Sequence, residues 1–179
     1  MTLQDTMQID CYVDADFVGL WNYEDSSDPT SCKCRSGFLF ILGGCPIFWS
    51  SKLQSEITLS TMESEYVALS MAMKELIPLQ RIVFEICNYL KVDLDKISTI
   101  KSELWEDNAG ALGLAKLAPP RMTPRSKHYA LKYHWFREFV RTENIGLNKI
   151  DTKVQFADIL TESLPREKFQ ILRQLLMGW

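Results

Sequence analysis

The tetrapeptide Ser60-Thr61-Met62-Glu63 divides the chain into a β-rich part and a mainly helical part. It has the S-x-x-E form of a capping box, in which the serine hydroxyl and the glutamate carboxylate satisfy backbone N–H groups at the start of a helix. Before it, residues 9–18 alternate apolar with other side chains, and residues 37–42 and 45–51 form two short β patterns around Gly43-Gly44. The sequence therefore predicts an antiparallel β-meander followed by a long helix.

The rest of the chain alternates strand and helix patterns. The long helix continues past Pro78, which bends or restarts it, to Leu90. The later elements are a strand at 100–106, a short helix at 109–117, an amphipathic helix at 127–141, a strand at 145–150, a second capping-box pattern at Thr152-Lys153-Val154-Gln155, and a helix at 156–176 broken at Pro165. The order β-β-β-α-β-α-α-β-α predicts one α/β layer fold, a mixed sheet with helices packed against it.

Length and composition indicate one folded domain spanning residues 1–179. Hydrophobic residues make up 46% and charged residues 24%, values typical of globular proteins and unlike those of disordered chains or coiled coils. The apolar runs are far shorter than the roughly 20 residues that cross a bilayer, and the N-terminus lacks a signal-peptide pattern. We therefore expect neither secretion nor a membrane partner.

Cysteine and histidine usage limits the metal chemistry. The five cysteines are scattered, which favours a reduced intracellular compartment. Only two histidines, His128 and His134, are available, and the nearest cysteine pair, Cys32 and Cys34, does not have the spacing of a zinc site. Any bound metal should have oxygen ligands.

Four carboxylates are the candidate site: Asp14, Glu65, Asp107 and Asp158. Asp14 lies in the first strand, and Asp107 follows a strand and precedes a helix. Open sheets bind ligands at the carboxyl ends of their strands. Projecting the apolar stripe Leu69, Ala72, Met73 and Leu76 back by four residues reaches Glu65, so Glu65 should face the sheet and Glu63 should not.

Converging carboxylates require protonation or a cation, because isolated buried charges are costly. Hard divalent ions, Mg²⁺ or Mn²⁺, suit such a site. Each acid also has a purely structural interpretation: Asp14 and Asp16 in a turn at a strand end, Glu63 and Glu65 at an exposed helix start, Asp107 as a helix N-cap, and Asp158 as a solvent-facing residue. The roles of Asp16 and Glu63 stay open.

A cationic segment contrasts with the acidic remainder of the chain. Residues 121–142 hold six basic residues and one acid, against 14 basic and 22 acidic residues elsewhere. In the helix predicted at 127–141, Lys127, His134, Arg137 and Arg141 should share one face. This face is either an ordinary solvated surface or a contact for a nucleic-acid backbone.

Seven sequence words, in order, resemble the ribonuclease H domain of copia-type LTR retrotransposon Pol polyproteins over nearly the whole chain. They are YVDADFVG (12–19), CRSGFLFILGG (34–44), WSSK (49–52), LSTMESEYVAL (59–69), EDNAGAL (106–112), SKHYALKYHWFRE (126–138) and ADILT (157–161), followed by Leu164-Pro165 and Lys168-Phe169. The resemblance implies a ribonuclease H-like fold with a five-stranded mixed sheet. It also implies the catalytic and metal-binding set Asp14, Glu65, Asp107 and Asp158.

The resemblance further implies an endonuclease that cuts the RNA strand of RNA–DNA hybrids with two Mg²⁺ ions, for which Mn²⁺ can substitute. Its partners would be the hybrid and the reverse transcriptase domain of the same polyprotein, inside a cytoplasmic virus-like particle. One departure is Glu162, where the family usually has lysine. The alternative function is a catalytically silent or domesticated fold that binds nucleic acid or protein. The cationic helix could contact the hybrid or dock on the reverse transcriptase.

Overall fold

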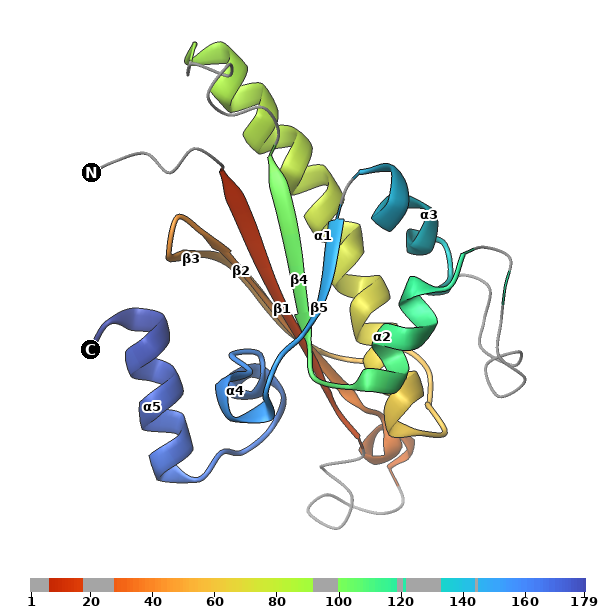
Figure 1. Ribbon diagram of the computed structural model, residues 1–179. Coiled ribbons are helices and arrows are strands. Elements are labelled where there is room, and N and C mark those ends of the chain that lie inside the picture. The colour runs from red at the N-terminus through yellow and green to blue at the C-terminus, as the bar shows by residue number, and fades with distance from the viewer. Residues whose placement is uncertain (1–6, 18–27, 92–99, 119–120, 122–132, 144) are drawn as a thin grey trace.

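The computed structural model describes residues 7–17, 28–91, 100–118, 121, 133–143 and 145–179 (Figure 1). Five strands form one mixed sheet with the order β3-β2-β1-β4-β5. The strands are β1 (Gln8–Asp16), β2 (Arg35–Leu42), β3 (Cys45–Leu53), β4 (Lys101–Glu106) and β5 (Ile145–Lys149). β1, β2 and β3 pair antiparallel, whereas β4 pairs parallel with both β1 and β5. The predicted five-stranded α/β layer fold is confirmed.

Helices cover both faces of this sheet. α1 (Thr61–Tyr89), α2 (Ala109–Lys116) and α3 (Phe136–Thr142) lie on one side, and α4 (Asp158–Thr161) and α5 (Arg166–Met177) on the other (Figure 1). Two short 3-10 turns, η1 (Pro29–Cys32) and η3 (Thr152–Val154), complete the described elements. Among the described residues, none of the helices combines the length and apolar character needed to cross a bilayer.

The alternation within β1 sets which side chains face which layer. Its residues Ile9, Cys11, Val13 and Ala15 are buried in the main core with the α1 residues Leu69 and Met73. The intervening residue Tyr12 points to the other face, where its ring lies 4.7 Å from that of Phe156, centroid to centroid. Asp14 has the parity of Tyr12, so its side chain faces the layer that contains α4.

The predicted cap of the long helix is confirmed. The backbone N–H of Glu63 donates to the Ser60 hydroxyl at 3.2 Å, and the Glu63 carboxylate accepts from the backbone N–H of Leu59 at 2.8 Å. α1 then runs without interruption through Pro78 to Tyr89. The predicted stripe Leu69, Ala72, Met73 and Leu76 is buried, and Glu65 lies at its N-terminal end with only 4% of its surface exposed.

The second predicted capping box, at residues 152–155, is wrong. Asp151, one residue earlier, accepts the cap hydrogen bond from the backbone N–H of Lys153 at 2.8 Å. The Thr152 hydroxyl donates instead to Oδ2 of Asp107, and the Gln155 amide donates to the carbonyl of Val13. These tertiary partners replace the local ones that the S/T-x-x-E/Q pattern assumes. The predicted break at Pro165 is confirmed, since α4 ends at Thr161 and α5 begins at Arg166.

Candidate metal centre

The four predicted acids lie around one pocket beyond the carboxyl ends of β1 and β4. Asp14 comes from β1, Glu65 from the first turns of α1, Asp107 from the residue after β4, and Asp158 from the start of α4. The pocket is also lined by Asp16, Asn108, Thr152 and Glu162, among others. Segments up to 144 residues apart in sequence therefore contribute acids to one hollow.

Three of these carboxylates are close enough to share one cation. One oxygen each from Asp14, Glu65 and Asp107 lie within 4.8 Å of one another. Oε2 of Glu65 is buried and has no hydrogen-bond partner among the residues that the structure describes, so a lone pair is left without compensation there. An all-oxygen donor set with an unsatisfied buried carboxylate fits a hard divalent ion such as Mg²⁺ or Mn²⁺.

The electrostatics of the pocket point to the same deficit of positive charge. Burial raises the pKa of Asp14 to about 7, and the negative charges of Asp158 and Asp107 add to this effect, while the Thr161 hydroxyl opposes it. Burial and the charges of Glu106 and Asp14 raise the pKa of Glu65 to about 11. Without a cation, Asp14 and Glu65 therefore stay protonated up to a higher pH than ordinary carboxylic acids do.

Hydrogen bonds hold the carboxylates in place. The Thr152 hydroxyl donates to Oδ2 of Asp107 at 2.6 Å, and the Thr161 hydroxyl donates to Oδ2 of Asp14. Asn108 caps α2, because its Oδ1 accepts from the backbone N–H groups of Gly110 and Ala111 at 2.9 and 3.0 Å. Asp107 is therefore not the N-cap of α2, and its carboxylate is available to the pocket.

The ambiguous acids separate in the structure. Glu63 is engaged at the α1 N-terminus and does not line the pocket, whereas Glu65 does. Asp16 lines the pocket but is not part of the close group formed by Asp14, Glu65 and Asp107. The prediction from the helical phase that Glu65 and not Glu63 faces inward is confirmed.

Asp158 has a cationic partner that sequence reasoning missed. The ammonium of Lys168 in α5 lies 2.5 Å from Oδ2 of Asp158 and 3.4 Å from Oε1 of Glu162. Burial still raises the pKa of Asp158 to about 6, against the opposing effect of Lys168. In the sequence, Lys168 is noted only as part of the Lys168-Phe169 match to the family. Its contact with Asp158 could not be predicted, because the contact depends on how α5 turns back after Pro165.

Glu106 is a fifth acid that the sequence analysis did not single out. It is fully buried, its Oε1 accepts from the backbone N–H of Asn108 at 2.9 Å, and within the described part of the chain its Oε2 has no hydrogen-bond partner. Burial raises its pKa well above the ordinary range of a glutamate. A signal was available: Glu106 lies two residues after the core residue Leu104, and side chains at that spacing share a face of a strand.

The predicted solvent-facing basic helix is wrong for two of its four members. Arg137 is only 2% exposed and donates to the carbonyl of Arg121 at 2.7 Å. His134 is 6% exposed, and its Nδ1 is hydrogen-bonded to the Tyr66 hydroxyl at 2.8 Å. α3 begins at Phe136, so His134 precedes it, and both side chains have hydrogen-bond partners within the protein. Arg141 is exposed, and Lys127 lies outside the described residues.

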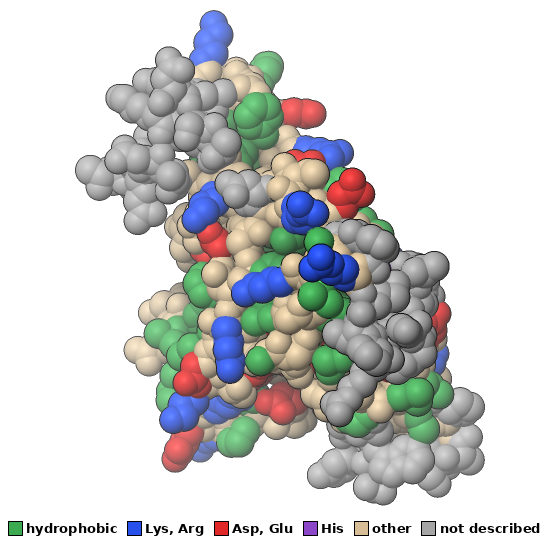
Figure 2. All heavy atoms as spheres, turned by 45° about the vertical axis from the view of Figure 1, so that its right-hand side comes forward, with side chains coloured by type: hydrophobic (Ala, Val, Ile, Leu, Met, Phe, Trp, Pro, Cys, Tyr) green, Lys and Arg blue, Asp and Glu red, His purple; other side chains and the backbone are tan. Residues whose placement is uncertain are grey.

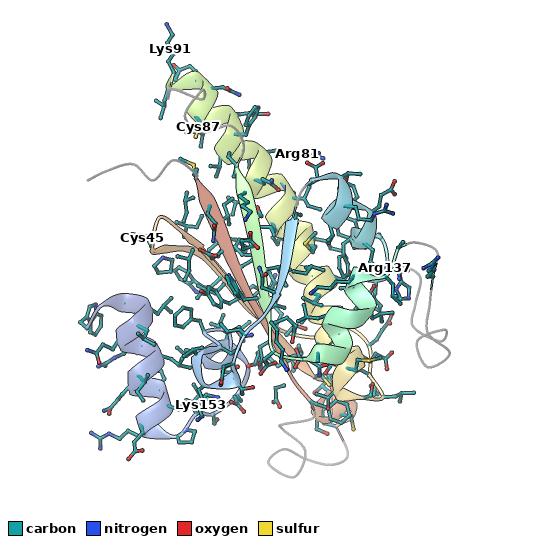
Figure 3. The ribbon with its side chains drawn as sticks, viewed as in Figure 1. Cys45, Arg81, Cys87, Lys91, Arg137 and Lys153 are labelled. Atoms are coloured by element: carbon teal, nitrogen blue, oxygen red, sulfur yellow. The ribbon has the colours of Figure 1, made fainter. Side chains whose placement is uncertain are left out.

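The surface charge is mixed rather than concentrated. On the face shown in Figure 2, Lys and Arg side chains are interspersed with Asp and Glu. Arg137, labelled in Figure 3, belongs to α3. The described residues on this face therefore do not form a continuous cationic stripe.

Comparisons with known sequences identify relatives of this chain. The chain is 34% identical over 165 residues to a retrovirus-related Pol polyprotein from a transposon of Nicotiana tabacum, an alignment that covers 92% of the chain and 11% of the polyprotein. The chain thus spans about a tenth of the length of this curated relative. No protein-family model matches the chain.

Solved structures provide an independent comparison of the fold. The N-terminal RNase H domain of a Mycobacterium tuberculosis protein superposes with a TM-score of 0.54 at 10% identity, covering 94% of this chain and 98% of that domain. LC11-RNase H1, solved in complex with an RNA/DNA hybrid, superposes with a TM-score of 0.52 at 16% identity, covering 86% of this chain and 93% of that one. The chain is therefore a homologue of part of the Pol polyproteins of plant copia-type transposons and has a ribonuclease H-like fold.

Proposed function

We propose that the chain is a divalent-metal-dependent nuclease that cuts the RNA strand of RNA–DNA hybrids. The observation that carries this proposal is the meeting of three carboxylate oxygens within 4.8 Å, with Asp158 on the same pocket. A buried acidic cluster of this kind in a ribonuclease H-like fold fits hydrolysis of a phosphodiester better than binding alone. The complex of LC11-RNase H1 with an RNA/DNA hybrid supports the substrate class.

Each acid has a defined task in this proposal. Asp14 belongs to the close group with Glu65 and Asp107 and would contribute to both metal positions. Glu65 and Asp107 would hold the ion on the leaving-group side, and Asp158 would complete the position on the side of the attacking water. Bound Mg²⁺, or Mn²⁺ in its place, supplies Lewis acidity and an activated water. Thr161 and Thr152 keep the carboxylates of Asp14 and Asp107 oriented.

The proposal also covers the contacts with the substrate and the domain beside which the chain acts. The exposed residue Arg141, together with Lys127 outside the described residues, would contact the hybrid backbone without reading bases. His134 and Arg137 are buried and would support this segment from within. Because the chain matches 11% of its polyprotein relative, we propose that it acts beside a reverse transcriptase of the same polyprotein, inside an intracellular particle.

The test is a cleavage assay on matched substrates. A hybrid with labelled RNA is incubated with the chain and Mg²⁺, and single-stranded RNA and RNA duplex of the same sequence serve as controls. We expect cleavage of the hybrid RNA alone, with 3′-hydroxyl and 5′-phosphate ends, and no cleavage by the Asp14→Asn variant at an unchanged circular dichroism spectrum. Equal cleavage by the variant would overturn the site assignment.

A further inference from the structure

We propose that the Lys168 ammonium is an internal cation of the candidate metal centre. It pairs with the Asp158 carboxylate in the metal-free protein and is displaced when a divalent ion binds. This inference rests on the proposed function, because it assumes that Asp158 is a metal ligand. It assigns to α5 a part in setting how tightly the site binds metal. Lys168 is accordingly a positioning residue rather than a catalytic one.

The contact geometry supports an occupied carboxylate. The Lys168 ammonium lies 2.5 Å from Oδ2 of Asp158, and the Asp158 side chain is only 4% exposed. The same ammonium lies 3.4 Å from Oε1 of Glu162, the acid at the rim of the pocket. A metal ion that takes Oδ2 of Asp158 would therefore meet an ammonium already at hydrogen-bond distance. Two cations cannot share that oxygen without strong repulsion.

The charge distribution explains why such a cation is present. Six acids line the pocket: Asp14, Asp16, Glu65, Asp107, Asp158 and Glu162. None of the described residues that line it is a lysine or arginine. Lys168 reaches Asp158 from a neighbouring hollow, lined by Thr152, Lys153, Glu167, Lys168 and Ile171, and Thr152 borders both hollows. The positive charge beside Asp158 is thus supplied by Lys168, which does not itself line the acidic pocket.

A displaced Lys168 ammonium has a neighbouring hollow into which it can move. The Lys168 side chain is 26% exposed, so its end can turn into the neighbouring hollow by rotation of its own flexible side chain. Lys153 of the same hollow, labelled in Figure 3, lies beside α4 and is exposed. Displacement of Lys168 therefore requires no movement of the backbone of α4 or α5.

If a metal ion displaces Lys168, replacing this residue should lower the melting temperature of the metal-free protein and increase its affinity for the ion. Lys168→Met removes the partner of a nearly buried carboxylate, so the metal-free protein should melt at a lower temperature. The same change removes the competitor of the metal, so affinity for the ion should increase by roughly fivefold, the equivalent of one ion pair. A residue that merely supported Asp158 would lower both stability and affinity when replaced.

Isothermal titration calorimetry with Mn²⁺ on the full chain, at fixed pH and ionic strength, compares four proteins. Lys168→Met should bind roughly fivefold more tightly than the wild-type chain, and Lys168→Arg, which keeps the charge, should bind like the wild type. Lys153→Met is the matched control, since it removes a positive charge from the same hollow. Its affinity should change far less than that of Lys168→Met.

A second measurement needs no substitution. In nitrogen-15 spectra of lysine side chains, the wild-type Lys168 ammonium should give the signal of a restrained ion pair without metal and of a solvated lysine at saturating Mg²⁺. An unchanged Lys168 signal, or a Lys168→Met affinity equal to or weaker than that of Lys153→Met, would overturn the inference alone. Absence of metal binding by all four proteins would overturn the proposed function with it.

Discussion

The hydroxyl of Thr161 in α4 donates a hydrogen bond to Oδ2 of Asp14 in β1, across 147 residues of sequence. The approach of α4 to the sheet depends on Gly37, the partner of Asp14 in β2. A Cβ atom at Gly37 would lie 2.6 Å from Cγ2 of Thr161 and 2.9 Å from Cβ of Leu160. The first carboxylate of the site is therefore oriented by the C-terminal part of the chain, through a gap that only glycine leaves open.

Loss of the Thr161 hydroxyl should weaken the site without changing its shape. Thr161→Val removes the donor to Asp14 and should lower the free energy of unfolding at pH 8 by about 1–2 kcal/mol. It should also lower metal affinity several-fold, because Asp14 loses its orientation. Calorimetric titration and urea denaturation measure both effects. Thr142→Val, which removes an exposed hydroxyl bonded to the Glu138 carbonyl, is the control and should have little effect on either.

An alanine at position 37 should separate α4 from the sheet. Gly37→Ala forces Thr161 and Leu160 to shift and should cost about 1–3 kcal/mol of stability. Gly113 in α2 has nothing within 4 Å of a Cβ position, so Gly113→Ala should stabilise the protein by up to about 1 kcal/mol. Thermal denaturation of the two variants should give shifts of opposite sign, and equal shifts would contradict the close approach at Gly37.

The two glutamates at the start of α1 should differ strongly in their effect on activity. Glu65→Gln removes a charge from the close carboxylate group and should lower hybrid cleavage by roughly 100-fold or more. Glu63→Gln weakens only the helix cap, so its activity should stay within about threefold of the wild type. Steady-state cleavage at saturating Mg²⁺ measures both. Equal losses would show that the assigned helical phase does not define the site.

The buried acid Glu106 should make the stability of the metal-free protein depend on pH. Its pKa is raised in the folded state, so its favourable contribution is complete below the pKa of the unfolded chain and is lost as the pH rises. Glu106→Gln can keep the acceptor for the Asn108 N–H but cannot ionise. The variant should match the wild type near pH 4 and exceed it at pH 8 by about 1 kcal/mol or more.

Urea denaturation in the presence of a chelator, at several pH values between 4 and 8, tests this prediction. Asp14 contributes in the same direction, because its pKa is raised to about 7 and its ionisation also opposes folding. The wild-type free energy of unfolding should therefore fall across this range. A constant difference between wild type and Glu106→Gln at all pH values would contradict ionisation of the buried carboxyl.

Local sequence patterns predicted much of the fold and the orientation of Glu65 toward the sheet. The Ser60–Glu63 cap and the apolar stripe of α1 depend on contacts within one or two helical turns, and both are present. The order of elements along the chain also predicted one mixed sheet with helices packed against it, but not the spatial order β3-β2-β1-β4-β5 of its strands. The convergence of Asp14 and Asp158 was supported only by the resemblance to a family, since periodicity carries no information on contacts so distant in sequence.

The wrong predictions share one physical cause. The side chains concerned form hydrogen bonds with residues distant in sequence instead of with near neighbours. Thr152 and Gln155 bond to Asp107 and Val13 instead of capping a helix. His134 and Arg137 turn inward to Tyr66 and Arg121, although their spacing fits an exposed face. Polar side chains of this kind are satisfied wherever the tertiary fold offers a partner, which a one-dimensional pattern does not specify.

Thermal denaturation with increasing Mg²⁺ tests most directly whether the carboxylates form a metal centre. An ion that binds only the folded state raises the melting temperature by mass action. At matched ionic strength, the wild-type chain should show an increase that saturates with Mg²⁺ or Mn²⁺. Asp14→Asn and Asp107→Asn should largely abolish it, while melting above the metal-free wild type because less charge repulsion remains. A wild-type melting temperature unchanged at about 20 mM Mg²⁺, where weak sites fill, would contradict the metal centre and favour a silent binding module.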